Sequence, residues 1–77
     1  MIDYLFTFRS LTAAQQAEML LIRYGIPCRL VRAPSRFSNN GCSFAVRVQD
    51  YYRTNAVFIQ ENLNYERVLQ WNGGDWV

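Results

Sequence analysis

The stretch Ile2-Asp-Tyr-Leu-Phe-Thr-Phe-Arg-Ser10 decides the fold, because it joins a strand pattern directly to the start of a helix. Its even-numbered residues from Ile2 to Phe8 are apolar and share one face of an extended chain, which is typical of a half-buried strand. Ser10 is a favoured N-cap residue, and apolar side chains recur at helical spacing over residues 11–24. Gly25 stands where a left-handed residue ends a helix. The stretch therefore predicts a strand and then a helix.

The rest of the chain repeats this pattern with an offset of about forty residues, so that Cys42 corresponds to Ile2 and Asp50 to Ser10. In the second copy Asp50 is the expected helix cap. The pattern predicts three more strands and one more helix: strands over 27–32, 42–48 and 65–71, and a helix over 51–62. The expected buried stripe of that second helix is Tyr52, Ala56, Ile59 and Leu63.

This order of elements predicts an α+β domain of the ferredoxin-like, split β-α-β type. Right-handed crossovers then give a four-stranded antiparallel sheet with strand order 4-1-3-2 and both helices on one face. Residues 1–72 form the expected single domain, and residues 73–77 form a short C-terminal tail. Trp76 in that tail is either loose or folded back onto the sheet. The fold is common and does not by itself indicate a function.

Charge and composition exclude several classes of partner. The chain has 77 residues, is 51% hydrophobic, and carries a formal net charge of +2. All its cations are arginines and no two are adjacent, so we expect no nucleic-acid partner and no membrane partner. The sheet face away from the helices is expected to be open and to permit a homodimer. Its expected side chains are Leu5, Val31, Ala45 and Val68 beside Asp3, Arg29, Arg47 and Glu66.

The absence of histidine limits the chemistry that the chain can perform alone. A Cys–His or Ser–His dyad cannot be built, and the spacing between Cys28 and Cys42 fits neither zinc nor redox motifs. We therefore expect no metal, no cofactor and no stand-alone enzyme. No signal-peptide pattern opens the sequence, so the expected location is the cytoplasm, where thiols stay reduced.

Cys42 is the candidate reactive residue, because it ends the turn-rich loop Ala33-Pro-Ser-Arg-Phe-Ser-Asn-Asn-Gly-Cys42 where a strand begins. In the predicted fold this point lies beside the end of the first strand and the start of the first helix, whose free amides lower a thiol pKa. The expected anion- or partner-binding residues around it are Arg9, Ser10, Arg36, Ser38 and Gly41.

Each cysteine also has a plainer interpretation, as a residue that packs in the core. Cys42 shares a face with Phe44 and Val46 and can equally be a packing residue, and Cys28 is expected to be one. A disulfide between the cysteines is not expected, because a hairpin that pairs Arg32 with Cys42 places Cys28 opposite Val46, too far away to bridge.

Several segments resemble a small bacterial family known as domain of unknown function 3343 and described as selenium/sulfur carrier protein-like. The resemblance covers roughly residues 4–70 and includes Phe6-Thr7-Phe8, Gly25-Ile26-Pro27, and Pro34-Ser35-Arg36-Phe37-Ser38 followed by Gly41-Cys42. It implies that Cys42 accepts sulfur or selenium as a persulfide or selenosulfide. A cysteine desulfurase-type donor would supply the atom, and an acceptor protein would receive it. Family members often have glycine after this cysteine, whereas this chain has Ser43.

The alternative function is a non-catalytic module of the same fold that senses an anion or binds a protein. In that case the 33–41 loop and the start of the first helix would hold the ligand, and Cys42 would be incidental. The two functions differ in whether a thiol reacts readily near neutral pH.

Overall fold

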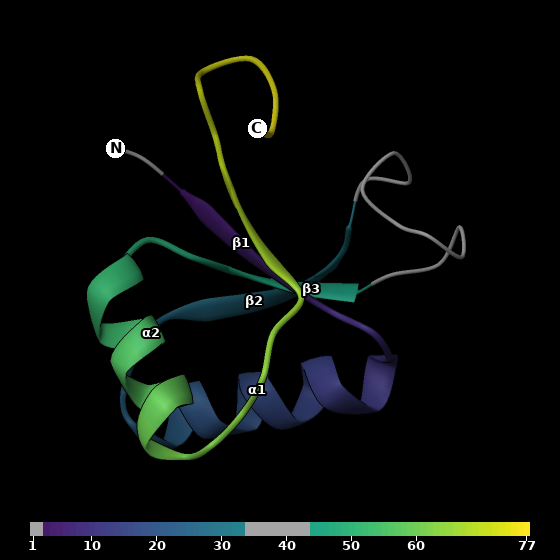
Figure 1. The fold of residues 1–77 in the computed structure, drawn as a ribbon. Helices are drawn as coiled ribbons and strands as arrows, with labels where there is room; N and C mark the ends of the chain where they lie inside the picture. The colour runs from purple at the N-terminus through teal and green to yellow at the C-terminus, as the bar shows by residue number, and fades with distance from the viewer. Residues whose placement is uncertain (1–2, 34–43) are drawn as a thin grey trace.

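The computed structural model describes residues 3–33 and 44–77 of the chain (Figure 1). Within these residues two helices and four strands follow one another in the predicted order, β-α-β-β-α-β, which confirms the α+β class. The elements are β1 (Tyr4–Phe8), α1 (Leu11–Arg23), β2 (Cys28–Arg32), β3 (Phe44–Val48), α2 (Tyr51–Gln60) and β4 (Arg67–Gln70). No described helix is both long enough and apolar enough to cross a membrane.

The strands form one antiparallel sheet in the order β2-β3-β1-β4, which is the predicted order read from the other edge. The predicted register between β2 and β3 was wrong by two residues. Arg32 pairs with Phe44, and Cys28 pairs with Val48. A shift of two residues keeps every side chain on its predicted face, because side chains alternate with a period of two.

The helix ends follow from local chemistry, as predicted. The Ser10 hydroxyl accepts the N–H of Ala13 at 3.1 Å, and the Asp50 carboxylate accepts the N–H of Arg53 at 3.1 Å. Gly25 has φ +75° and closes α1, with the N–H of Ile26 bonded to the Leu21 carbonyl at 2.9 Å.

The second helix ends in the same way, but two residues earlier than predicted. Asn62 takes the left-handed conformation, with φ 61°. The N–H of Leu63 then bonds to the Phe58 carbonyl at 2.9 Å. This is the hydrogen-bond pattern that closes α1, so the two halves of the chain share their cap chemistry at both ends of the helix.

The main core combines side chains of both helices with those on one face of the sheet. Figure 1 shows α1 and α2 next to each other, and both place buried side chains in one cluster with this sheet face. The buried members are Phe6, Phe8, Ala14, Ala17, Leu21, Ile26, Val46, Val48, Val57 and Phe58. Tyr4 and Phe44 pack against this cluster, so the aromatic stripe of β1 and β3 belongs to the core.

The predicted buried stripe of α2 was wrong at Tyr52, Ala56 and Ile59, although Leu63 packs against the core. Tyr52 is 83% exposed and Ile59 is 69% exposed, whereas Thr54, Val57 and Phe58 are buried. Residues 56–59 are all apolar, so they surround the helix and their spacing does not select a face. Packing against the sheet selects it instead.

The opposite face of the sheet carries a second, smaller cluster. Leu5, Ala33, Ala45 and Leu69 are buried in it, and Val31 and Trp76 pack against it. Leu69 takes the place expected for Val68, which packs against the main core instead. This face is therefore less open than the sequence suggested.

The C-terminal tail returns along the sheet, which decides between the two alternatives for Trp76. Trp76 forms a bridge with Trp71, and their ring centroids lie 5.2 Å apart. The turn between them is closed by the Asn72 side chain, whose Oδ1 accepts the N–H groups of Gly74 at 3.1 Å and Asp75 at 2.9 Å. The Arg47 guanidinium lies 5.5 Å from the centre of the Trp76 ring.

Candidate functional site

The predicted site lies where β1 ends and β3 begins, and the described strands do meet there. Phe44 pairs with Phe8 on one side and with Arg32 on the other, so the ends of β1 and β2 and the start of β3 share one edge of the sheet. Arg9 and Ser10 follow β1 directly at this edge. The other predicted site residues lie outside the described residues: Arg36, Ser38, Gly41 and Cys42.

Arg9 and Ser10 already have contacts within the fold. The side chain of Arg9 is 89% exposed, and its Nε lies 3.9 Å from a carboxylate oxygen of Glu66. The hydroxyl of Ser10 is the N-cap of α1. The first turn of α1 contains no acidic side chain. The positive end of the helix dipole is therefore not neutralised by a carboxylate of the same turn.

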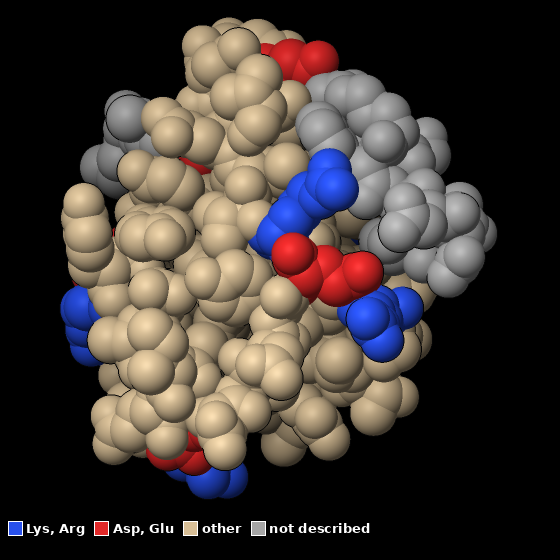
Figure 2. All heavy atoms as spheres, in the orientation of Figure 1, with Lys and Arg blue, Asp and Glu red and all other residues tan. Residues whose placement is uncertain are grey.

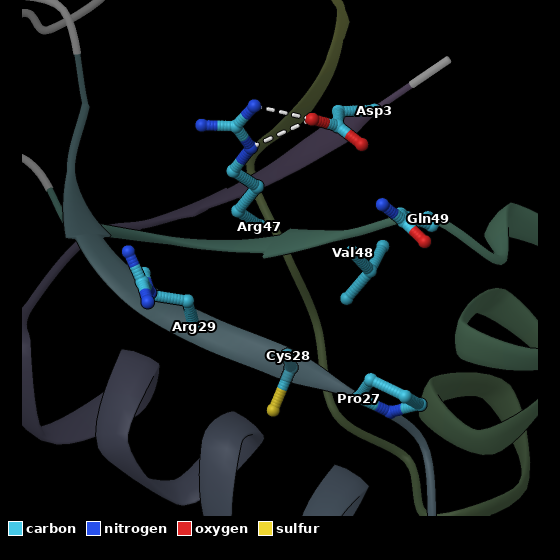
Figure 3. A pocket seen from close by; sticks show the side chains of 7 residues that line it. All are labelled: Asp3, Pro27, Cys28, Arg29, Arg47, Val48 and Gln49. Atoms are coloured by element: carbon cyan, nitrogen blue, oxygen red, sulfur yellow. Dashed lines mark hydrogen bonds and ion pairs between the residues drawn. The ribbon is translucent and has the colours of Figure 1, made fainter. Parts of the chain in front are cut away.

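Cys28 is the cysteine that the structure describes, and its thiol packs inward. Figure 3 shows its sulfur pointing toward α1, on the other side of the sheet from Arg47. The half-buried Cys28 thiol donates a hydrogen bond to the Glu18 carbonyl, with an Sγ–O distance of 3.7 Å. Burial raises the pKa of Cys28 above its ordinary value of 9.0, and the charge of Glu18 raises it further. At neutral pH this thiol is protonated, as expected of a packing residue.

A shallow depression of about 400 Å³ lies beside Cys28 at the start of β2 (Figure 3). Its lining residues are Asp3, Pro27, Cys28, Arg29, Arg47, Val48 and Gln49. Arg29 and Arg47 are direct cross-strand neighbours. Asp3 accepts hydrogen bonds from Nε of Arg47 at 2.9 Å and from its Nη2. Arg29 has no acidic partner among the described side chains.

The ion pair between Asp3 and Arg47 was not predicted from the sequence. The signal was present in the strand pattern. Asp3 and Arg47 point to the same face of the sheet, and Arg47 pairs with Leu5, two residues from Asp3. Such diagonal positions are within reach of long side chains.

The face drawn in Figure 2 is mostly uncharged, and where charged side chains adjoin one another on it, basic and acidic groups lie side by side, so no patch of one sign forms there. Among residues 3–33 and 44–77, no group of three or more His, Cys, Asp or Glu side chains is arranged to hold a metal ion.

Residues 3–70 match the family described as "Putative Se/S carrier protein-like". The match covers β1 through β4, together with positions 28 and 42. No curated protein and no solved structure matches the chain.

Proposed function

Because this chain belongs to the Se/S carrier protein-like family, we propose that it carries sulfur or selenium on Cys42 as a persulfide or selenosulfide. The family match supports the carrier role, and the environment of Cys28 supports the choice of Cys42. A half-buried thiol that donates to the Glu18 carbonyl has little thiolate at neutral pH, and the thiolate is the form that attacks. The inward-facing Cys28 is the single observation on which the choice of thiol depends.

The proposed step is an exchange of one sulfur atom between two thiols. The Cys42 thiolate attacks the terminal sulfur of a persulfide on a donor protein. A bond forms between the Cys42 sulfur and that terminal sulfur, while the bond from the terminal sulfur to the donor breaks and the donor leaves as a thiolate. A selenosulfide transfers selenium by the same exchange. Since electrons and atoms balance, neither a metal nor an added oxidant is required.

The candidate binding residues from the sequence provide the proposed electrostatic support. Arg9, Ser10, Arg36, Ser38 and Gly41 are assigned to binding the anionic persulfide or a partner. Arg9 is exposed enough to turn toward an anion, since its contact with Glu66 is long at 3.9 Å and exposed. The N-terminal amides of α1 favour a negative charge at the same edge.

The proposed partners are a cysteine desulfurase-type donor and an acceptor protein, in the cytoplasm. We propose no nucleic-acid partner, no membrane partner and no stand-alone enzymatic activity, and we retain a homodimer through the second sheet face. We also propose that the fold is ferredoxin-like with both helices on one face, because α1 and α2 share one core cluster with the same side of the sheet.

Single-cysteine variants test the proposal. The wild type, Cys28→Ser and Cys42→Ser are each incubated with a cysteine desulfurase and free cysteine, and their intact masses are then measured. We expect the wild type and Cys28→Ser to gain the mass of one sulfur atom and Cys42→Ser to gain none. Circular dichroism confirms that both variants are folded.

The alternative module predicts a different result. If the wild type gains no sulfur under conditions that load a known carrier, or if Cys42→Ser loads as well as the wild type, the carrier function on Cys42 is wrong. Retained anion or partner binding in Cys42→Ser would then favour the sensing or interaction module.

A further inference from the structure

The two edge strands of the sheet, β4 and β2, differ in whether described residues pair with their outer sides. The outer edge of β4 is covered near its end by the tail, since Gln70 and Val77 exchange backbone hydrogen bonds of 2.8 Å and 2.9 Å. The strand β2 is the other edge, and no described residue pairs with its outer side. An uncovered edge presents a row of backbone donors and acceptors that can bind another extended chain.

The charges along β2 indicate what kind of chain would bind. Arg29 and Arg32 are exposed on this strand. Arg29 lies directly opposite Arg47, and like charges at directly opposed positions destabilise a sheet. Asp3 compensates Arg47, but no described carboxylate compensates Arg29. A carboxylate on a strand added outside β2 would supply the missing partner.

We propose that the outer edge of β2 binds an extended acidic segment of a partner protein by strand addition. Backbone hydrogen bonds to the edge provide the docking, and carboxylates on the face of Arg29 provide the selectivity. The depression lined by Pro27, Cys28 and Arg29 lies at the start of this edge and can receive one side chain of the added strand. The inference is independent of the carrier function.

A second copy of this chain fits the edge less well. Pairing β2 with another β2 would bring two arginines from each strand into one ribbon without any acidic partner. An acidic strand removes this repulsion, so the charges favour a different protein.

The probe is the blocked peptide Asp-Val-Glu-Val-Asp-Val-Glu, titrated at low salt into the full-length protein labelled with nitrogen-15. We expect amide shifts concentrated on residues 28–32 and their β3 neighbours. Arg29→Glu should weaken binding by about tenfold or more, because it replaces a close attraction with a repulsion. This variant should fold normally, since Arg29 is exposed and a glutamate there faces Arg47.

Arg53→Glu is the matched control. It makes the same change of charge at an exposed position in the first turn of α2, where a negative side chain suits the helix dipole. The Arg53 guanidinium donates to the Tyr24 carbonyl at 3.4 Å, before β2 begins. The variant should change the affinity less than twofold to threefold, because position 53 lies on a helix and not on the β2 edge. Equal weakening by the two variants would show that only net charge attracts the peptide, and would overturn the proposal.

Backbone pairing is tested on the peptide itself. Two N-methylated versions block the odd-numbered or the even-numbered amides, and only one set can face β2. Loss of binding by one version and retention by the other supports strand addition. Equal binding by both, shifts centred outside β2, or no shift at all would each contradict it, as would a protein that dimerises through β2 in place of binding the peptide.

Discussion

Among single residues, the two cysteines are distinguished by their surroundings more than by their sequence neighbours. Cys28 lies on an edge strand, where a thiol can be accessible to solvent. Its sulfur nevertheless turns inward and donates to a helix carbonyl, which holds the proton on sulfur. The same contact argues against Cys28 as a carrier residue, because attack on a persulfide requires the thiolate.

The raised pKa of Cys28 predicts a slow alkylation rate in the folded protein. In Cys42→Ser, where Cys28 is the remaining thiol, iodoacetamide should react slowly at pH 7, and the rate should still be rising with pH above the ordinary thiol pKa of 9.0. The same variant in denaturant provides the reference and should react faster at every pH below that value. Equal rates in the folded and unfolded states would contradict the inward-facing thiol.

The raised pKa of Cys28 also determines how the stability of the fold changes with pH. The folded state holds the Cys28 proton more tightly than the unfolded state does. The raised pKa of Cys28 therefore contributes to the free energy of unfolding. This contribution is fully present below pH 9.0, the ordinary thiol pKa, and is lost as the pH rises through the pKa of the folded state.

Two buried threonines form a matched pair for a test of hydrogen bonding. Thr54 is fully buried in α2, and its hydroxyl has no hydrogen-bond partner in the described part of the chain. The hydroxyl of Thr7, also buried, donates to the Arg67 carbonyl at 3.3 Å and accepts the Arg67 N–H at 3.1 Å. The two residues are the same chemical type and differ in whether the desolvated hydroxyl is satisfied.

We expect Thr54→Val to increase the free energy of unfolding by about 1 kcal/mol, because it removes an unsatisfied buried hydroxyl. Thr7→Val should decrease it by about 1–3 kcal/mol, because it leaves a backbone group without its partner. Urea unfolding of both variants measures the difference. A destabilised Thr54→Val would show that the hydroxyl has a partner in solution.

Among the structural elements, the tail is the one whose position the sequence left open. Trp76 contacts Trp71, lies beneath the Arg47 guanidinium, and packs against the second hydrophobic cluster. Arg47 is in turn bonded to Asp3. The tail thus joins the end of β4 to the centre of the sheet through aromatic and cation–π contacts.

Trp76→Ala should reduce the free energy of unfolding by about 2 kcal/mol, less than for a fully buried ring, because the indole is half-buried. Tyr52→Ala is the control, since Tyr52 is 83% exposed, and it should change stability by at most about 0.5 kcal/mol. Chemical denaturation measures both. Equal effects of the two substitutions would mean that the tail is not docked in solution.

The elements also show which features the sequence could predict. The caps at Ser10 and Asp50 were predicted because a cap is formed by side chains and amides within one turn. The buried face of α2 was not, because apolar residues surround that helix and distant strands choose among them. The register of β2 against β3 depends on the connection between them, and the register expected from the strand pattern alone was wrong by two residues.

For the whole molecule, the strand order was the most productive prediction. It followed from two β-α-β units and right-handed crossovers, and the structure confirms it. That order brings the start of β3 beside the end of β1, which is why Arg9 and Ser10 share an edge with the chain that follows Cys42. The ion pair of Asp3 and Arg47 needed the register as well, so it became visible only in the folded molecule.

The most direct test of the carrier function locates the transferred sulfur in the wild-type chain. After loading by a cysteine desulfurase and free cysteine, persulfides are trapped by alkylation and the protein is cut with trypsin. The two cysteines fall on separate peptides, Tyr24–Arg29 and Phe37–Arg47, so one mass spectrum distinguishes them. We predict the additional sulfur on Phe37–Arg47 alone. Additional sulfur on Tyr24–Arg29, or on neither peptide, would contradict the carrier function of Cys42.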